Sequence, residues 1–137
     1  MGRKEMKITP DTNILVRAVL RDDVKEGRAA ARLLIEAELI AISLSSLCEF
    51  VWVLRRVYSL GVEDISSALQ ALLDAGNVVV NRPAVDAGLA ILHEGGDFAD
   101  GITAYEGSWL GGETFVSFDK RAVALLSSQG QQAKLLT

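Results

Sequence analysis

The sequence is poor in the residues that disulfides, zinc sites and aromatic binding surfaces require. Its 137 residues include one cysteine, Cys48, and one histidine, His93, and only 6% of them are aromatic. A lone cysteine excludes an internal disulfide, and a single histidine beside it leaves no ligand set for a closed zinc site. Two-histidine ribonuclease chemistry is excluded as well, and the scattered aromatics give no sign of a base-stacking platform. We expect a chain from a reducing compartment, the cytoplasm.

Long apolar runs are also missing. The longest, from Phe50 to Leu54, is far too short to cross a bilayer, and the N-terminus has no apolar core of secretory length. We therefore expect no membrane association. The chain is about one domain long and 50% apolar, which is ample for one core. We interpret residues 1–5 as a dispensable extension and residues 6–137 as a single domain.

Short β-like runs alternate with longer helical segments along the chain. The predicted strands cover residues 7–10, 40–43, 77–81, 113–119 and 133–136, and the predicted helices cover residues 12–20, 26–37, 45–58, 62–76, 84–93, 97–111 and 120–130. Strands separated by helices favour a parallel sheet that is covered on both faces. The predicted fold is α/β: a three-layer α/β/α sandwich around a mainly parallel sheet of about five strands.

Some helix ends have recognisable signals. Ser45 and Ser46 are predicted to supply the N-cap of the helix that runs to about Tyr58. Gly76 is the predicted C-cap of the helix before it, and His93 is predicted to end a helix. The helix that begins near residue 97 should be slightly weakened at its start by Gly101.

Five acids follow predicted strands or begin predicted helices. Asp11 ends the first strand, Glu49 follows the second, and Asp119 follows the fourth. Asp97 and Asp100 are three residues apart, so both can point from one face of a helical turn. Because ligands of open α/β sheets bind beyond the carboxyl ends of the strands, we expect these five carboxylates to share one edge of the sheet.

Each of these acids also has a purely structural explanation. Asp11, Asp97 and Asp119 could be N-caps, Asp100 would lie favourably against a helix dipole, and Ser46 with Glu49 fits a capping box. Every strand-to-helix junction of a parallel sheet lies at the same edge, so capping acids would gather there without any function. The alternative function is therefore a non-catalytic α/β protein-binding module whose acids are helix caps.

The surroundings of the acids favour a metal site over caps alone. Glu49 is the only charge in LCEFVWVL, so we expect its helix to be buried, where an unpaired carboxylate is costly. Two carboxylates about 4 Å apart repel by roughly 4 kcal/mol at an effective dielectric near 20. A group of four or five needs a cation nearby, and oxygen-only ligands suit Mg²⁺ or Mn²⁺.

Four segments in order, TPDTNILVRAVL, SLCEFVWVL, GGDFADGITA and TFVSFDKRAV, resemble the PIN-domain ribonucleases, most closely the VapC toxins of toxin-antitoxin pairs. The resemblance runs from Met6 to the C-terminus. It implies that Asp11, Glu49, Asp100 and Asp119 form an acidic quartet that holds Mg²⁺ or Mn²⁺, with Asp97 as an additional acid. It further implies that Thr12 and Ser117 support the site and that Asn13 orients the first loop.

The resemblance implies a metal-dependent endoribonuclease, in which metal-activated water hydrolyses RNA and leaves 5′-phosphate and 3′-hydroxyl ends. A net charge of −4 argues against a nucleic-acid partner, but the argument weakens if five acids line one metal-filled pocket. Candidates for a basic rim that contacts RNA are Arg17, Arg21, Arg82, Lys120 and Arg121.

The resemblance also implies a homodimer and a VapB-type antitoxin. Trp52, Leu54 and Tyr58 could form an apolar groove for such a partner, or could be buried in the core. A phosphatase of the haloacid-dehalogenase type would need a second aspartate two residues after Asp11, where Asn13 stands. The acid pairing of a receiver domain is absent too.

Overall fold

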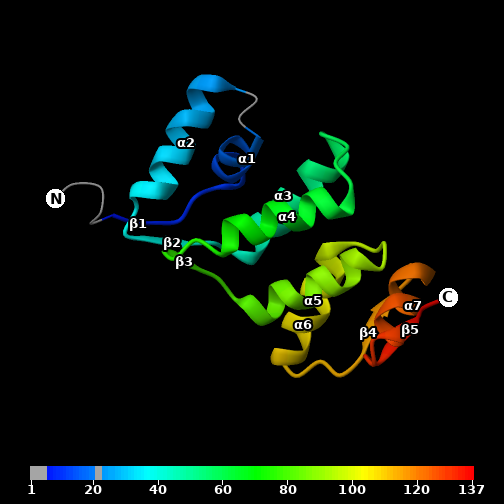
Figure 1. The fold of residues 1–137 in the computed structure, drawn as a ribbon. Helices are drawn as coiled ribbons and strands as arrows, with labels where there is room; N and C mark the ends of the chain where they lie inside the picture. Colours follow the sequence, from blue (N-terminus) through cyan, green and yellow to red (C-terminus); the bar gives the residue numbers. More distant parts are fainter. Residues whose placement is uncertain (1–5, 21–22) are drawn as a thin grey trace. The chain divides into compact units, whose positions relative to one another are not determined.

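The computed structural model describes residues 6–20 and 23–137. The predicted extension, residues 1–5, and the candidate Arg21 lie outside these ranges. The chain divides into two compact units, the first ending at Asn81 and the second running from Arg82 to Thr137 (Figure 1). Each unit has its own helices and its own small sheet.

The first unit contains three strands and four helices among its described residues. They are β1 (Lys7–Ile8), α1 (Thr12–Leu20), α2 (Val24–Glu36), β2 (Leu39–Ala41), α3 (Leu44–Arg56), α4 (Val62–Leu73) and β3 (Val78–Val79). The strands form a parallel sheet in the order β1-β2-β3, in which Ile40 lies opposite Ile8 on one side and Val78 on the other. Helices connect successive strands, as parallel pairing requires.

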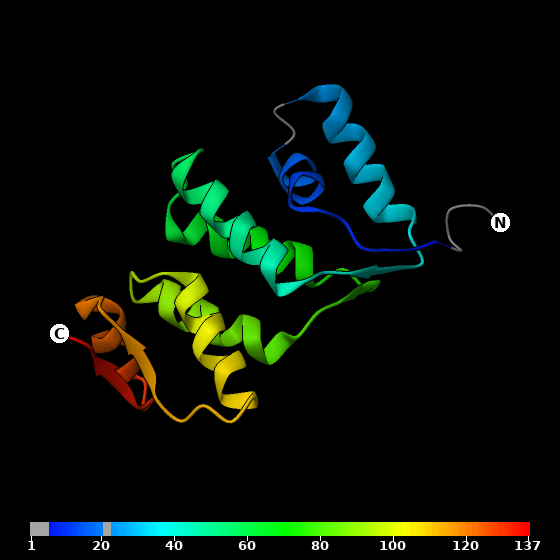
Figure 2. The same cartoon turned by 180° about the vertical axis from the view of Figure 1, so that it is seen from behind.

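Apolar side chains at helical spacing form the core of the first unit. On α3, Leu47, Phe50, Val51 and Leu54 are buried, which places one stripe of the helix against α1 and α4. α1 also packs against α2. Figure 2 shows the same helix pairs from behind.

The second unit consists of α5 (Arg82–His93), α6 (Phe98–Trp109), β4 (Phe115–Ser117), α7 (Lys120–Ser128) and β5 (Ala133–Leu135). β4 and β5 form a parallel pair, with Val116 opposite Lys134. α7 connects the two strands and packs against both of them. α5 and α6 lie side by side in Figures 1 and 2 and form the most extensive helix contact of the unit.

Two glycines permit the close approach of α5 and α6. A Cβ atom at Gly101 would lie 2.7 Å from the Cα of Gly88 and would also collide with the carbonyl oxygen of Ala87. A Cβ atom at Gly88 would lie 2.8 Å from the ring of Phe98. Gly101 therefore does more than weaken the helix start, because the packing of α6 on α5 leaves no room for a side chain beside Asp100.

The order of strands and helices agrees with the sequence prediction, and the fold is α/β with parallel strands. The single sheet of about five strands is not present among the described residues, because β4 and β5 form a sheet separate from β1, β2 and β3. In the described part of the chain, no helix is long and apolar enough to cross a membrane.

The predicted helix caps were partly wrong. Ser43, rather than Ser45 or Ser46, caps α3, because its side chain accepts a hydrogen bond from the backbone N–H of Ser46. α4 ends before Gly76, and Asp74 is its C-cap. α5 ends at His93, as predicted.

Candidate functional site

Asp11 and Thr12 lie where β1 leads into α1. Oδ1 of Asp11 accepts a hydrogen bond from the backbone N–H of Ile14 at 3.0 Å, as an N-cap does. Oγ1 of Thr12 donates a hydrogen bond to Oε1 of Glu49 at 2.8 Å, from the first residue of α1 to the second turn of α3. This contact brings two of the expected site residues together.

The predicted burial of Glu49 was wrong. Glu49 is exposed, and so is Trp52 three residues later, on the side of α3 opposite the buried stripe. The capping box was also wrong, because Ser43 rather than Ser46 caps this helix. Glu49 therefore contacts Thr12 from an exposed position and needs no buried counter-charge.

In the second unit, Asp97 is the N-cap of α6 and Asp119 is the N-cap of α7. Oδ1 of Asp97 accepts a hydrogen bond from the backbone N–H of Ala99 at 3.0 Å. Oδ1 of Asp119 accepts from the N–H groups of Arg121 and Ala122, at 2.9 and 3.3 Å. Ser117 accepts a hydrogen bond from the N–H of Asp119 through its Oγ at 3.0 Å, so it orients the residue beside it.

Asp100 is the acid whose protonation the fold perturbs. Burial raises the pKa of Asp100, and the negative charges of Asp97 and Asp119 raise it further. Electrostatic coupling of this kind means that the three carboxylates lie close enough to repel one another. The second unit therefore gathers three of the five acids that the sequence singled out.

The capping interpretation is right for three acids, and the grouping of all five acids into one site stays a prediction. Asp11, Asp97 and Asp119 each accept a backbone hydrogen bond at the start of a helix. Within the described residues, no three Asp, Glu, His or Cys side chains come close enough to hold a metal ion together.

The donor chemistry nevertheless fits a divalent cation. Asp97, Asp100 and Asp119 offer only oxygen atoms, which Mg²⁺ and Mn²⁺ prefer. In the described part of the chain, Oδ2 of Asp11, Asp97 and Asp119 accepts no hydrogen bond, because each cap uses Oδ1. A cation would also relieve the repulsion that raises the pKa of Asp100.

The basic candidates have different surroundings. Nε of Arg17 forms an ion pair with Oε1 of Glu26 at 3.2 Å, and both side chains line a hollow of about 220 Å³ between α1 and α2, together with Asn13. Arg82, Lys120 and Arg121 are exposed. The guanidinium of Arg121 lies against Gly95 in the turn between α5 and α6.

The sequence analysis missed an apolar hollow in the first unit. It has a volume of about 760 Å³ and is lined by α1, α2, α4, β2 and β3, with Leu34, Ile35, Ala68, Ala71 and Leu72 among its apolar side chains. Small residues were the available signal: Ala31 on α2, Ala68 and Ala71 on α4, and Ala75 just after α4. On α3, Leu54 is fully buried, which agrees with the core alternative for that residue, while Trp52 is 57% exposed.

The chain matches the family model of the PIN domain over residues 8–125, and it belongs to that family. PIN domains are generally nucleases and typically use divalent metals, and the family suggests RNA binding. A comparison with curated proteins gives no significant match.

Proposed function

We propose that this chain is a metal-dependent endoribonuclease, the toxin of a VapC-type toxin-antitoxin pair in the cytoplasm. The observation that carries the proposal is that Asp97 and Asp119 lie close enough to Asp100 for their charges to add to burial in raising its pKa. Asp97 rather than Asp100 is the N-cap of α6, so capping does not explain the acid at position 100. Membership of the PIN domain family supports the same function.

The proposed catalytic group consists of Asp11, Glu49, Asp100 and Asp119, which with Asp97 would hold Mg²⁺ or Mn²⁺. Support comes from the family match, which includes all five acids and extends over both units. Thr12 would hold Glu49 through its hydroxyl, Ser117 would orient Asp119, and Asn13 would shape the first loop.

The same proposal includes one PIN domain over residues 6–137, built as a three-layer α/β/α sandwich with a single five-stranded sheet. Among the described residues, β1 pairs only with β2 and β4 only with β5, so each of these strands has an edge without a strand partner. Unpaired edges are usually covered in natural proteins. Val116 and Phe118, in and after β4, are 51% and 76% exposed, which suits a strand that gains further packing.

A bound divalent ion would activate water and shield the charge of the scissile phosphate. The chain's own contribution is to orient the ligands. The backbone hydrogen bonds to Oδ1 direct Asp97 and Asp119. Burial raises the pKa of Asp100 and the charges of Asp97 and Asp119 raise it further, and a bound cation would offset those two charges. The products would carry 5′-phosphate and 3′-hydroxyl ends.

The test is cleavage of a mixed RNA pool, tRNA included, with Mg²⁺, Mn²⁺ or EDTA. Asp100→Asn should abolish metal-dependent cleavage, while the matched variant Asp86→Asn, an exposed aspartate on α5, should keep it. Equal cleavage by wild type and Asp100→Asn would reveal a contaminating nuclease. Products with 2′,3′-cyclic phosphate would contradict the metal-activated water.

The alternative, a non-catalytic protein-binding module, is favoured by the three capping hydrogen bonds to Asp11, Asp97 and Asp119. Calorimetric titration with Mn²⁺ separates the two functions. A nuclease site should bind Mn²⁺ in a way that depends on Asp11 and Asp100. A module of caps should show no such binding.

The partner part of the proposal comprises the RNA substrate, a homodimer and a VapB-type antitoxin. RNA would approach along Arg17, Arg21, Arg82, Lys120 and Arg121, with Arg21 outside the described residues. The apolar hollow between α2 and α4 suits an amphipathic antitoxin segment, and Glu36 and Glu38 in its lining would attract basic side chains.

Ala71→Glu, in that lining, should weaken inhibition by the antitoxin at least tenfold, whereas Gln70→Glu beside it should not. Sedimentation equilibrium tests the homodimer.

A further inference from the structure

Arg121 reaches from the first turn of α7 to the turn that precedes Asp97. Its backbone N–H donates a hydrogen bond to Oδ1 of Asp119 at 2.9 Å, so its main chain belongs to the cap of α7. Its side chain extends the other way. A Cβ atom built on Gly95 would lie 2.5 Å from Nη2 of Arg121, so the guanidinium lies directly against the backbone of Gly95.

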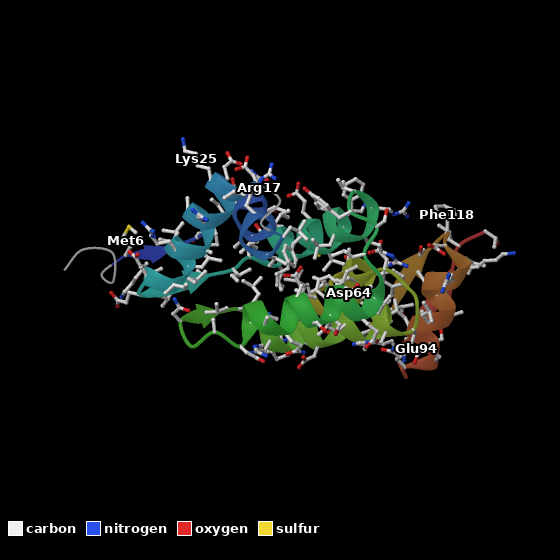
Figure 3. The ribbon with its side chains drawn as sticks, turned by 45° about the horizontal axis from the view of Figure 1, so that its top comes forward. Met6, Arg17, Lys25, Asp64, Glu94 and Phe118 are labelled. Atoms are coloured by element: carbon white, nitrogen blue, oxygen red, sulfur yellow. The ribbon has the colours of Figure 1, made fainter. Side chains whose placement is uncertain are left out.

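Gly95 is suited to this contact in two ways. Its φ of +89° is in the left-handed region that favours glycine, and its missing side chain leaves the space that the guanidinium occupies. The same turn packs against α7, because a Cβ atom at Gly96 would lie 2.5 Å from Cδ1 of Leu125. Figure 3 labels Glu94, which begins this turn. Arg121 is exposed, and its guanidinium lies in contact with the backbone of this turn.

The guanidinium lies close to the chain segment that leads into Asp97, but among the described residues it forms no ion pair with an acid. Gly95 precedes Asp97 by two residues, which span at most about 7 Å of chain. Among the described residues, no carboxylate lies within 4 Å of the Arg121 guanidinium. A cation at the turn before Asp97 that is not paired with a described acid has its donors available for an anion next to that turn.

We propose that Arg121 binds a phosphate of the RNA backbone next to the phosphate that is cleaved, in a position set by Gly95. A guanidinium binds phosphate through two parallel hydrogen bonds, and its orientation matters more than that of a lysine ammonium. The inference rests on the proposed nuclease function, since it places the neighbouring phosphate at the acids. It adds a substrate-positioning residue that the acidic motifs do not contain.

The chain offers a closely matched pair of variants. Gly95→Ala would force the Arg121 guanidinium out of its position while keeping its charge. Gly130→Ala introduces the same backbone strain, because Gly130 has a φ of +86°, but nothing lies within 4 Å of its Cβ position. Arg121→Ala removes the charge itself. Thermal unfolding would show that all three variants are folded.

Two measurements follow on each protein. The first is the affinity for a fluorescein-labelled single-stranded RNA at several salt concentrations, with Ca²⁺ in place of Mn²⁺. The second is kcat and KM for RNA cleavage with Mn²⁺. Arg121→Ala should lower the slope of log Kd against log salt by about 0.7, which corresponds to one phosphate contact on a single strand. It should also raise Kd about tenfold.

Gly95→Ala should raise Kd and KM by a similar factor with the salt slope reduced, while Gly130→Ala should match the wild type. If the wild type cleaves RNA and both Arg121→Ala and Gly95→Ala keep its salt slope and KM, the Arg121 contact is refuted and the nuclease stands. If the wild type cleaves nothing but both variants lose the salt slope, the nuclease is refuted and the phosphate contact stands. Absence of salt-dependent RNA binding by the wild type overturns both.

Discussion

The hydroxyl of Thr12 lies 2.8 Å from Oε1 of Glu49 and donates a hydrogen bond to it across 37 positions of sequence. Glu49 is exposed, so without this contact its side chain would be free to rotate. The same hydroxyl lies 3.5 Å from the carbonyl oxygen of Ser46, one turn earlier on α3. Thr12 therefore ties the start of α1, next to Asp11, to the carboxylate of a proposed metal ligand.

Thr12→Val should lower activity with little loss of stability. The change removes the hydrogen bond that orients Glu49 and keeps the shape of the side chain, and loss of such an outer contact typically lowers metal affinity or activity about 10- to 100-fold. Mn²⁺ affinity by calorimetry and cleavage rates would measure the effect. Thr12→Ser, which keeps the hydroxyl, should remain close to wild type, and equal losses in both variants would contradict the role given to the hydroxyl.

Asp100→Asn should stabilise the metal-free protein at neutral pH. The folded-state pKa of Asp100 is raised by burial, Asp97 and Asp119, so the native state binds this proton more tightly than the unfolded state. The stability from this group is fully present below the ordinary aspartate pKa of about 3.9 and is lost as the pH rises through the raised value. Asp100→Asn has no carboxyl to ionise at this position, so it does not lose this stability as the pH rises.

Calorimetric Tm values measured in EDTA test whether Asp100→Asn is more stable than the wild type. The Tm of Asp100→Asn should exceed that of wild type at pH 7, and the difference should shrink as the pH falls below about 4. Asp86→Asn serves as the exposed control. An unchanged or lower Tm for Asp100→Asn at pH 7 would show that the carboxylates do not destabilise one another.

Gly101→Ala should destabilise the protein by about 1–3 kcal/mol, the usual effect of overpacking, because its Cβ atom would collide with the backbone of α5. A Cβ atom at Gly107, on the same helix, would meet nothing within 4 Å. Gly107→Ala should therefore raise the free energy of unfolding by up to about 1 kcal/mol, because alanine has the higher helix propensity. Urea denaturation of both variants measures the contrast. Stabilisation by both would mean that α5 and α6 are not held this closely.

Asn77→Ala should destabilise the first unit. Nδ2 of Asn77 donates hydrogen bonds to the carbonyl oxygens of Leu34 and Ala37, both at 2.9 Å, and so satisfies the end of α2. Leaving partly buried carbonyl groups without donors costs about 1–3 kcal/mol. The free energy of unfolding in urea should show this loss, and Gln70→Ala, an exposed amide on α4, should change it little.

The periodicity of the sequence predicted the order of the elements, because apolar spacing and capping residues are local signals. The bounds of α1 (Thr12–Leu20) agreed with the prediction. The burial of Glu49 was misjudged because LCEFVWVL is apolar around most of the helix. Leu47, Phe50, Val51 and Leu54 follow helical spacing, and that spacing alone puts Glu49 on the other side.

Contacts between distant segments were outside the reach of sequence reasoning. The sequence did not identify Ser43 as the N-cap of α3, because Ser43, Ser45 and Ser46 have the same side chain. Only the backbone conformation decides which of the three caps the helix. No local pattern links Thr12 to Glu49, or Gly95 to Arg121, because tertiary packing creates both contacts. The acids themselves were found because their positions after strands are a property of the order of elements.

In the proposed metal site, the capping bonds of Asp11, Asp97 and Asp119 would make folding and metal affinity interdependent. Each carboxylate gives Oδ1 to the backbone and keeps Oδ2 available, so each can offer a cation one oxygen whose rotation has already been restricted during folding. Little side-chain entropy is then left to lose on binding. A substitution that removes the carboxylate would remove a helix cap with it. A substitution at any of these three positions would therefore lower the stability of the metal-free protein and, in the proposed site, its affinity for metal as well.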